Sequence, residues 1–407
     1  MLKQVSLNSF WLLSGRILTL GLNVIFVALI ARRLGVNVFG QYALFTSIAY
    51  LGNFFTTYGT DVLLIREISR TRVISNSVFT SLWLQLFLSC IWILIISFAC
   101  LFFIDDIGIL KTLVIVNISL IPLAFQAIYN SILRAFERMD IYAGLNLFSV
   151  FGQAVLSYFL IHTKDDFFKL GAVILFSQIF TACIGYFICR AILPSLTFIK
   201  KVSVLEVLFL FRTGWRLALL APLATLFQRM NLFIVSIILG AEASGFLSAA
   251  SRLVEGIKIA HFSVSNSLMP TMARPNSTQT DSTLRFSLFF LLLWSFTFAL
   301  FLMFFASSVV ELIYGSSYSA SIIVLQVTGW VLIPYTFSIY YSLKLTMRGF
   351  ETLVLKANLI TLPCAIVLYF ALIVKFGLLG SVWGVLVNEI MLAFLLFFFY
   401  YRLTRSI

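Results

Sequence analysis

Nine ionisable side chains interrupt the apolar stretches of this 407-residue chain. A guanidinium group can hold two phosphate oxygens at once, and an ammonium group binds phosphate as a point charge. Cations outnumber carboxylates here, so the set favours binding of an anion, ideally a phosphate or pyrophosphate. A cation exporter is expected to show the opposite balance. The nine residues are the cations Arg16, Arg216, Arg229, Arg252 and Lys258, the carboxylates Asp61, Glu255 and Glu389, and His261.

Two of these cations have no acid within helical reach in their own apolar stretch. Arg16 lies well inside the first stretch, and Arg229 lies near the middle of the seventh. A charge at the centre of a bilayer costs at least about 3 kcal/mol unless it meets water or a partner. We therefore expect a water-filled cationic cavity. The predicted substrate-binding residues are Arg16, Arg229, Arg252, Lys258 and Arg216.

The other charged groups have local explanations. Arg216 lies near the inner end of its stretch, so it can extend to the lipid headgroups. Glu255 lies three residues from both Arg252 and Lys258 and can pair with either, which still leaves one surplus positive charge. The candidates for ion coupling or charge pairing are Glu255, Glu389, Asp61 and His261.

Neither a metal site nor a catalytic site is indicated. The five cysteines all lie inside apolar runs, as small buried residues do. The two histidines, His162 and His261, are far apart and show no metal-ligand spacing with a cysteine. A lone histidine in a membrane helix is more often a packing or hydrogen-bonding residue. We expect no catalytic residue, no metal and no cofactor.

The elements that carry these residues are predicted to be membrane-spanning helices. The chain is 61% hydrophobic and only 11% charged, with a mean hydropathy of +1.07. Its apolar runs are far longer than the roughly ten residues of a barrel strand, so they predict helices. The first run is also too long for a cleavable signal peptide. The predicted spans are approximately 8–30, 42–60, 78–103, 112–133, 142–162, 168–190, 214–239, 244–269, 284–305, 320–343, 354–374 and 379–401.

The remaining Lys and Arg residues lie mainly on one side of these twelve spans. With the N-terminus inside, seventeen fall in inner loops and tails and six in outer loops. Cytoplasmic loops carry such an excess, so both termini are predicted to be cytoplasmic. The same asymmetry explains the net charge of +13 without a nucleic-acid partner.

Several short phrases recur half a chain apart and indicate an internal duplication. Leu34-Gly35 with Gly40 matches Leu239-Gly240 with Gly245, and Arg134-Ala135-Phe136-Glu137 matches Arg348-Gly349-Phe350-Glu351. Six spans in each half make the two bundles parallel, and such transporters bind substrate between rocking halves. The predicted domains are a six-helix bundle at 1–190, a cytoplasmic linker at 191–213 and a second six-helix bundle at 214–407.

These phrases also resemble the Wzx-type O-antigen and polysaccharide flippases. The resemblance rests on Ser14-Gly15-Arg16 before Ala31-Arg32-Arg33-Leu34-Gly35, on Phe39-Gly40-Gln41-Tyr42, on Ala249 through Gly256, and on Tyr314-Gly315 before Tyr318. It implies the multidrug/oligosaccharidyl-lipid/polysaccharide exporter superfamily, whose two bundles form a V around a central cavity. It implies an undecaprenyl-diphosphate-linked oligosaccharide, such as an O-antigen repeat unit, moved to the periplasmic leaflet of a bacterial inner membrane. A polysaccharide polymerase and a chain-length regulator are the implied protein partners.

Two other functions stay open. An ion-coupled drug or metabolite antiporter of the same superfamily would need an acid-dominated cavity. A membrane polysaccharide polymerase or ligase usually carries a long outer loop, whereas every predicted outer loop here is short. The sequence contains no glycine-rich nucleotide-binding loop, which excludes direct use of ATP. It does not distinguish between protons, sodium and the membrane potential as the driving force.

Overall fold

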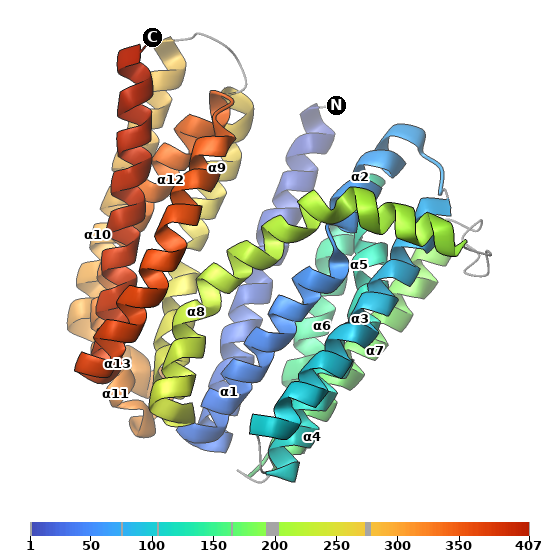
Figure 1. The fold of residues 1–407 in the computed structure, drawn as a ribbon, viewed down its shortest axis with the longest axis horizontal. Coiled ribbons are helices and arrows are strands. Elements are labelled where there is room, and N and C mark those ends of the chain that lie inside the picture. Colours follow the sequence, from blue (N-terminus) through green and yellow to red (C-terminus); the bar gives the residue numbers. More distant parts are fainter. Residues whose placement is uncertain are drawn as a thin grey trace. The chain divides into compact units, whose positions relative to one another are not determined.

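The computed structural model describes residues 2–74, 76–103, 106–163, 166–192, 203–272 and 278–406. Within these ranges it describes the side chains except at 2–9, 103, 213–224, 227, 266–272, 278–283, 347, 404 and 406. The described residues form helices, short turns and loops (Figure 1). The helices are α1 (Leu2–Thr57), α2 (Thr60–Thr71), α3 (Asn76–Phe103), α4 (Ile107–Ile118), α5 (Leu120–Ala135), α6 (Met139–Leu160), α7 (Phe167–Ile192), α8 (Val204–Ile257), α9 (Ile259–Met272), α10 (Thr278–Ile313), the short 3₁₀ helix η2 (Ser316–Tyr318), α11 (Ala320–Trp330), α12 (Leu332–Met347) and α13 (Glu351–Ser406).

Three of these helices are each interrupted by one glycine. The break lies at Gly35 in α1 (φ 77°), at Gly240 in α8 (φ 85°) and at Gly377 in α13 (φ 60°). A positive φ is strained for a residue with a Cβ, so glycine is suited to these positions. Figure 1 shows that α1 and α13 each consist of two arms joined by a reversal. Each long helix therefore runs in one direction and returns.

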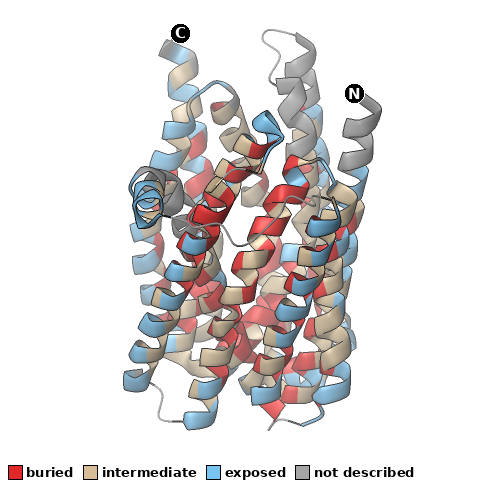
Figure 2. Ribbon diagram, turned by 90° about the vertical axis from the view of Figure 1, so that its right-hand side faces the viewer, coloured by how far each residue is buried: buried red, intermediate tan, exposed pale blue. Residues whose placement is uncertain are grey.

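Long apolar helices dominate the described part of the chain. Nine helical segments among the described residues have the length and composition to cross a membrane: Phe10–Thr57, Asn76–Phe102, Ile107–Ala135, Met139–Leu160, Phe167–Ile192, Gln228–Ser265, Leu284–Ile313, Ala320–Thr346 and Glu351–Leu403. Many large apolar side chains on them face outward, for example Ile237, which is 83% exposed, and exposed residues line the outer faces of the helices in Figure 2. Such surfaces suit hydrocarbon rather than water. The chain is an all-α, multi-pass membrane protein.

The helices group into two compact units. Unit 1 comprises Met1–Gly35 and Tyr42–Arg229, and unit 2 comprises Val36–Gln41 and Met230–Ile407. The division falls inside α8, later in the chain than the predicted linker at 191–213. Residues 193–202 of that linker lie outside the described residues. Its described remainder is helical from Val204 onward, since α8 begins there.

The first part of α8 packs on unit 1. The Tyr58 hydroxyl donates a hydrogen bond to the Phe211 carbonyl at 3.0 Å, and the two rings stack with centroids 5.0 Å apart. The Asn76 side-chain amide donates to the Glu206 carboxylate at 3.0 Å. Burial raises the pKa of Tyr58, which keeps this hydroxyl protonated as a donor.

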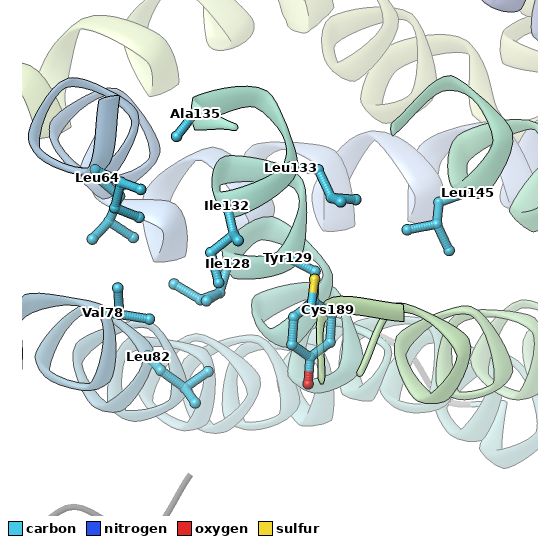
Figure 3. Packing of buried hydrophobic residues seen from close by; sticks show 11 residues of the cluster. Leu64, Val78, Leu82, Ile128, Tyr129, Ile132, Leu133, Ala135, Leu145 and Cys189 are labelled. Carbon is cyan, nitrogen blue, oxygen red and sulfur yellow. The ribbon is translucent and has the colours of Figure 1, made fainter. Parts of the chain in front are cut away.

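The core of unit 1 is an apolar cluster contributed by five helices. Figure 3 shows Leu64 of α2 and Val78 and Leu82 of α3 around Ile128 and Ile132 of α5. Leu145 of α6 and Cys189 of α7 complete the cluster on its other side. Burying such side chains gains roughly 1.5–3 kcal/mol each in water, but in lipid close packing replaces this gain as the main attraction. The cluster fixes α5 at the centre of unit 1.

Unit 2 includes a short segment from the middle of α1. The Phe39 side chain is fully buried there, with its ring centroid 6.0 Å from that of Tyr318 and 6.4 Å from that of Tyr314. A Cβ on Gly40 would lie 1.7 Å from the Ala241 carbonyl oxygen, and one on Gly245 would lie 2.3 Å from the Val36 carbonyl oxygen. The two recurring glycine phrases therefore pack backbone against backbone in a reciprocal contact.

The turn between α5 and α6 has a counterpart between α12 and α13, and the ends of these helices give the offset between the two turns. Helix α5 ends at Ala135 and α12 at Met347, and α6 begins at Met139 whereas α13 begins at Glu351. Each pair is 212 residues apart, two fewer than the offset of the Arg-x-Phe-Glu match. Glu137 (φ 59°) thus corresponds to Gly349 (φ 81°), both left-handed residues of the same turn. At this offset the turn after α5 corresponds to the turn after α12, two residues away from the register of the Arg-x-Phe-Glu match.

Candidate functional site

Two predicted cations, Arg16 and Arg229, belong to unit 1. Arg16 is exposed on α1, next to Gly15, where a Cβ would lie 2.6 Å from the Cβ of Ala143. This close approach of α6 to α1 fixes the helix that carries Arg16. Arg229 is half-buried on α8, with its guanidinium carbon 5.7 Å from the centroid of the Tyr50 ring. A guanidinium over an aromatic face is attracted by the ring electrons and keeps its planar fork oriented.

Two more, Arg252 and Lys258, belong to unit 2. Arg252 is half-buried on α8, and its guanidinium carbon lies 5.9 Å from the centroid of the buried Phe39 ring. Glu255, one turn further along, is exposed. Burial raises the pKa of the neighbouring Tyr314 to about 12, with Arg252 opposing the shift and Glu255 adding to it. The fifth predicted cation, Arg216, lies on α8 with its side chain outside the described residues.

Lys258 occupies the single residue between α8 and α9. Its Nζ lies 4.2 Å from the centroid of the Tyr335 ring on α12, a close cation–π contact. The break between the helices places the ammonium group inside unit 2 next to aromatic and polar side chains.

Glu389 on α13 lies near the same point. The Ser338 hydroxyl of α12, which donates to the Pro334 carbonyl at 3.2 Å, and the Lys258 ammonium group both lie near enough to act on the Glu389 carboxylate. Among the described residues the two do not form a contact ion pair within 4 Å. Asn388, which precedes Glu389, is buried and lies beside Tyr369 on the first arm of α13.

His261 is fully buried on α9 and hydrogen-bonds to two hydroxyl groups. Its Nε2 lies 2.8 Å from the Thr336 hydroxyl on α12 and 3.1 Å from the Ser295 hydroxyl on α10, and these two hydroxyls are 2.8 Å apart. Its ring centroid lies 5.3 Å from that of Tyr335. Tyr335 therefore contacts both residues, His261 through this ring pair and Lys258 through the cation–π contact.

We refer to Lys258, His261, Tyr335, Ser338 and Glu389 as the unit 2 polar cluster. Four helices, or their ends, bring these five side chains together. The sequence showed Lys258, His261 and Glu389 as separate candidates and did not connect Tyr335 or Ser338 with them. Spacing along one helix cannot reveal contacts between helices, and a serine or tyrosine in an apolar run carries no distinctive signal.

Asp61, the remaining acidic candidate, lies apart from this cluster in unit 1. It stands in the first turn of α2 and lines a cavity of about 380 Å³ together with Asn53, Asn130, Arg134 and Tyr142. The Arg134 guanidinium carbon lies 5.7 Å from the centroid of the Tyr142 ring. The other cavity of note, about 480 Å³ in unit 2, is lined by apolar residues such as Trp330, Phe337 and Ile390.

Nothing in the described part of the chain gathers three or more histidine, cysteine or acidic side chains in a way that could hold a metal ion. The chemistry of these residues is therefore that of charged and hydrogen-bonding groups. Arginines can bind an anion, and the unit 2 polar cluster can hold exchangeable protons.

Comparison with solved structures identifies the fold. A multidrug resistance MATE family transporter of the MOP superfamily in its inward-facing conformation matches with a TM-score of 0.70 and 16% identity, over 94% of this chain and 93% of that chain. A MOP superfamily transporter from Pyrococcus furiosus, for which a reversed polarity of the binding pocket suggested a different function, matches with a TM-score of 0.68 and 14% identity, over 96% and 94%. At such identities the likeness shows the fold alone.

Comparison of the sequence with family models and with curated proteins completes the assignment. No curated protein matches the chain. The model of the polysaccharide biosynthesis protein family matches residues 5–275, which is more than half of the chain. The resemblance to the Wzx-type polysaccharide family is thereby confirmed at the level of the family. This protein belongs to the polysaccharide biosynthesis protein family, with the fold of the MATE transporters of the MOP superfamily.

Proposed function

We propose that this protein moves a polyprenyl-diphosphate-linked oligosaccharide, such as an O-antigen repeat unit, from the cytoplasmic to the periplasmic leaflet of a bacterial inner membrane. Membership in the polysaccharide biosynthesis family is the observation that carries the proposal. The excess of cations within apolar helices supports an anionic substrate. Lipids surround the prenyl tail, and a polysaccharide polymerase and a chain-length regulator would use the product.

The substrate chemistry explains why such a transporter needs these residues. A diphosphate does not cross hydrocarbon unaided, because its charges would lose their hydration. Arg16, Arg229, Arg252 and Lys258 would replace that hydration with charge-assisted hydrogen bonds. A potential negative inside favours outward movement of anionic charge by about 2.3 kcal/mol per charge per 100 mV.

The proposed topology has twelve crossings with both termini in the cytoplasm. Among the nine candidate helices in the described part of the chain, three span 48, 38 and 53 residues. Each of these is more than twice the roughly 17 residues that the shortest crossing requires. Each of these three contains a glycine break, at Gly35, Gly240 and Gly377. Two crossings for each bring the total to twelve, in two parallel bundles of six. Transport would proceed by alternating access, with the binding cations open to one side at a time.

The proposal is tested with purified protein in liposomes that carry a fluorescent polyprenyl-diphosphate oligosaccharide in one leaflet. Movement is read from the fraction of label that a membrane-impermeant quencher no longer reaches. We expect Arg229→Ala and Arg252→Ala each to lower the rate about 10- to 100-fold, as for loss of a charged hydrogen bond worth roughly 1.5–3 kcal/mol. Arg→Lys variants should keep part of it, since lysine binds phosphate without the bidentate fork.

The control is Lys375→Ala, which removes an exposed cation on α13 and should leave the rate unchanged. Unaltered transport in Arg16→Ala, Arg229→Ala and Arg252→Ala alike would exclude these cations as substrate ligands. Movement of cationic drugs but not of the lipid-linked oligosaccharide by the unaltered protein would favour the antiporter instead.

A further inference from the structure

Helix α12 packs along the second arm of α13, which follows Gly377, and the two helices share a face that changes in character along its length (Figure 1). Residues three or four positions apart lie on one side of a helix. On α12 and directly after it, the residues of this face are Ile333, Phe337, Tyr341, Lys344 and Arg348. On α13 they are Leu386, Ile390, Ala393, Phe397 and Tyr400. Both series begin with apolar residues and end with aromatic or basic ones.

The apolar end of this face is hollow. It forms the cavity of about 480 Å³, which is lined by Trp330, Ile333, Pro334, Phe337, Leu386, Ile390 and Ala393. The cavity is open at the surface of the helices, since Ile390 is 51% exposed. Its volume falls within the range of about 300–1,000 Å³ that small-molecule sites have. None of the lining side chains is charged, so a hydrocarbon chain is the occupant that suits the cavity.

The other end of the face holds two positive charges over one aromatic ring. The Lys344 Nζ and the Arg348 guanidinium carbon each lie 4.9 Å from the centroid of the Tyr400 ring. Lys344 also lies over Tyr340, with its Nζ 4.8 Å from that centroid. Neither cation forms an ion pair with another described residue. Two like charges gathered at one ring repel each other, so the arrangement favours an anion that contacts both.

Tyr341 connects the cavity with the cations. Its ring centroid lies 5.3 Å from that of Phe397, which follows the last cavity residue of α13 by one turn, and 5.7 Å from that of Tyr400. Tyrosines of this kind are enriched where membrane helices leave the hydrocarbon, because the ring is apolar and the hydroxyl is polar. The face is therefore continuous from the hydrocarbon-lined cavity to the basic end.

The length of the face matches one leaflet of a bilayer. Ile333 and Arg348 are separated by a helical rise of roughly 22 Å. Half of a bilayer measures about the same, since the whole is about 40–45 Å thick with its headgroups. The segment Ala320–Thr346 is one of those able to cross a membrane, so Lys344 lies at its end and Arg348 just beyond it. The two cations are thus at the depth of lipid phosphates.

We propose that this face binds one anionic glycerophospholipid of the membrane, with the phosphate between Lys344 and Arg348 and an acyl chain in the cavity. In the proposed topology both α12 and α13 end on the cytoplasmic side, where basic pockets between membrane helices bind anionic headgroups. The bound lipid would hold the ends of α12 and α13 together. The assignment to the inner leaflet rests on the proposed function and its topology, whereas lipid binding does not.

Binding is tested on purified full-length protein in a neutral detergent, with dioleoylphosphatidylglycerol as the probe. A ligand that binds only the folded protein raises its unfolding temperature with concentration, and native mass spectrometry counts the lipids that stay bound. We expect a saturable rise with one lipid retained. The rise should be smaller with dioleoylphosphatidylcholine, whose headgroup has no net charge, and absent with inorganic phosphate. Lys344→Gln and Arg348→Gln should each weaken phosphatidylglycerol binding about fivefold, as for one cation near a membrane surface.

Three further variants separate a built site from diffuse surface charge. Lys375→Gln is the matched control, because this exposed cation of α13 lies over a single ring, with its Nζ 5.2 Å from the Phe376 centroid. It should leave binding unchanged. Tyr400→Leu keeps both cations but removes the ring that positions them, so it should weaken phosphatidylglycerol binding. Ile390→Asn places a polar group in the cavity and should weaken binding of both lipids, since their acyl chains are the same.

Four results would contradict these expectations. Equal affinity for the two lipids, or unchanged phosphatidylglycerol affinity in Tyr400→Leu, would reduce the basic end to diffuse charge and overturn the proposal. An equal effect of inorganic phosphate would make it a site for free anions. Displacement of phosphatidylglycerol by a lower concentration of polyprenyl diphosphate would overturn the choice of occupant. Absence of substrate movement in the liposome assay would refute the proposed function instead, and the lipid count would still decide this site.

Discussion

At the scale of single residues, charges in this protein are held in two different ways. Those at helix ends have dedicated partners, as in the pair of Arg138 and Asp140, with Nη2 and Oδ2 3.1 Å apart. Those deeper in the helices, such as Arg229, Arg252 and Lys258, lie over aromatic rings. An aromatic face attracts a cation without neutralising its charge.

Asp166 offers a residue-scale prediction of pH dependence. Lys169 donates to this carboxyl, as do the backbone N–H groups of His162 and Thr163, and together they hold its pKa well below the usual range. Because the folded pKa is depressed, the stabilisation is present above the unfolded pKa of about 3.9 and is lost as pH falls through the lower folded value. We expect Asp166→Asn to lower stability by about 1 kcal/mol at pH 7 and to flatten the acid dependence.

The measurement for Asp166 is thermal unfolding in detergent at pH 7 and at stepwise lower pH. Asp140→Asn serves as a comparison, because that carboxylate is more exposed and pairs with an exposed arginine. An Asp166→Asn variant with the stability of the unaltered protein at pH 7 would contradict this role.

At the scale of elements, glycines decide where helices turn and how closely they approach. Gly35, Gly240 and Gly377 supply the left-handed backbone at which three long helices reverse. Gly40 and Gly245 instead permit contact, because each lies against the backbone of the other recurring phrase within unit 2. The segment Val36–Gln41 thereby anchors the middle of α1 in unit 2, while both arms of α1 belong to unit 1.

Substitution of these contact glycines tests the reciprocal packing. A Cβ at Gly40 would lie 1.7 Å from a backbone oxygen, which cannot move aside as a flexible side chain would. We expect Gly40→Ala and Gly245→Ala each to destabilise the protein by about 1–3 kcal/mol or more, as overpacking does. Gly144→Ala on α6, where a Cβ meets nothing within 4 Å, is the matched control and should be neutral or stabilising. Equal unfolding temperatures for all three variants in detergent would refute the close contact.

At the scale of the whole molecule, the described residues form two units, and the chain passes from one to the other three times, at two places. One join is the pair of crossings at either end of Val36–Gln41, and the other lies between Arg229 and Met230 in α8. The second is a continuous helix, whereas the first adjoins the left-handed Gly35. The glycine-containing join is therefore the one at which backbone rotation is least hindered.

The proposed twelve-crossing topology makes a prediction for the whole chain. In a background free of cysteine, Asn37→Cys should react from outside the cell with an impermeant maleimide, because this exposed residue lies in the proposed outer turn of α1. Glu137→Cys, exposed in the turn between α5 and α6, should react only after the membrane is permeabilised. The reverse pattern of labelling would invert the topology, and labelling of both from outside would exclude it.

The sequence alone determined the class of protein and that its apolar runs are helices. Apolar runs predict helices because lipid leaves every backbone polar group to be satisfied within the segment. The same runs, with the recurring phrases around Gly35 and Gly240, led to the family that the comparisons confirm. The residues of interest followed too, since any charge in such a run is conspicuous.

The tertiary structure decided which of these residues lie together. It joined Lys258, His261 and Glu389 through Tyr335 and Ser338, and it left Asp61 in a separate cavity of unit 1. It also shifted the register of the duplicated turn, so that Glu137 corresponds to Gly349. The reason is geometric: spacing along a helix specifies neighbours three and four residues away, whereas contacts between helices depend on rotation and approach. At Gly40 and Gly245 that approach is set by the absence of a side chain, and the sequence records the glycine but not the backbone it meets.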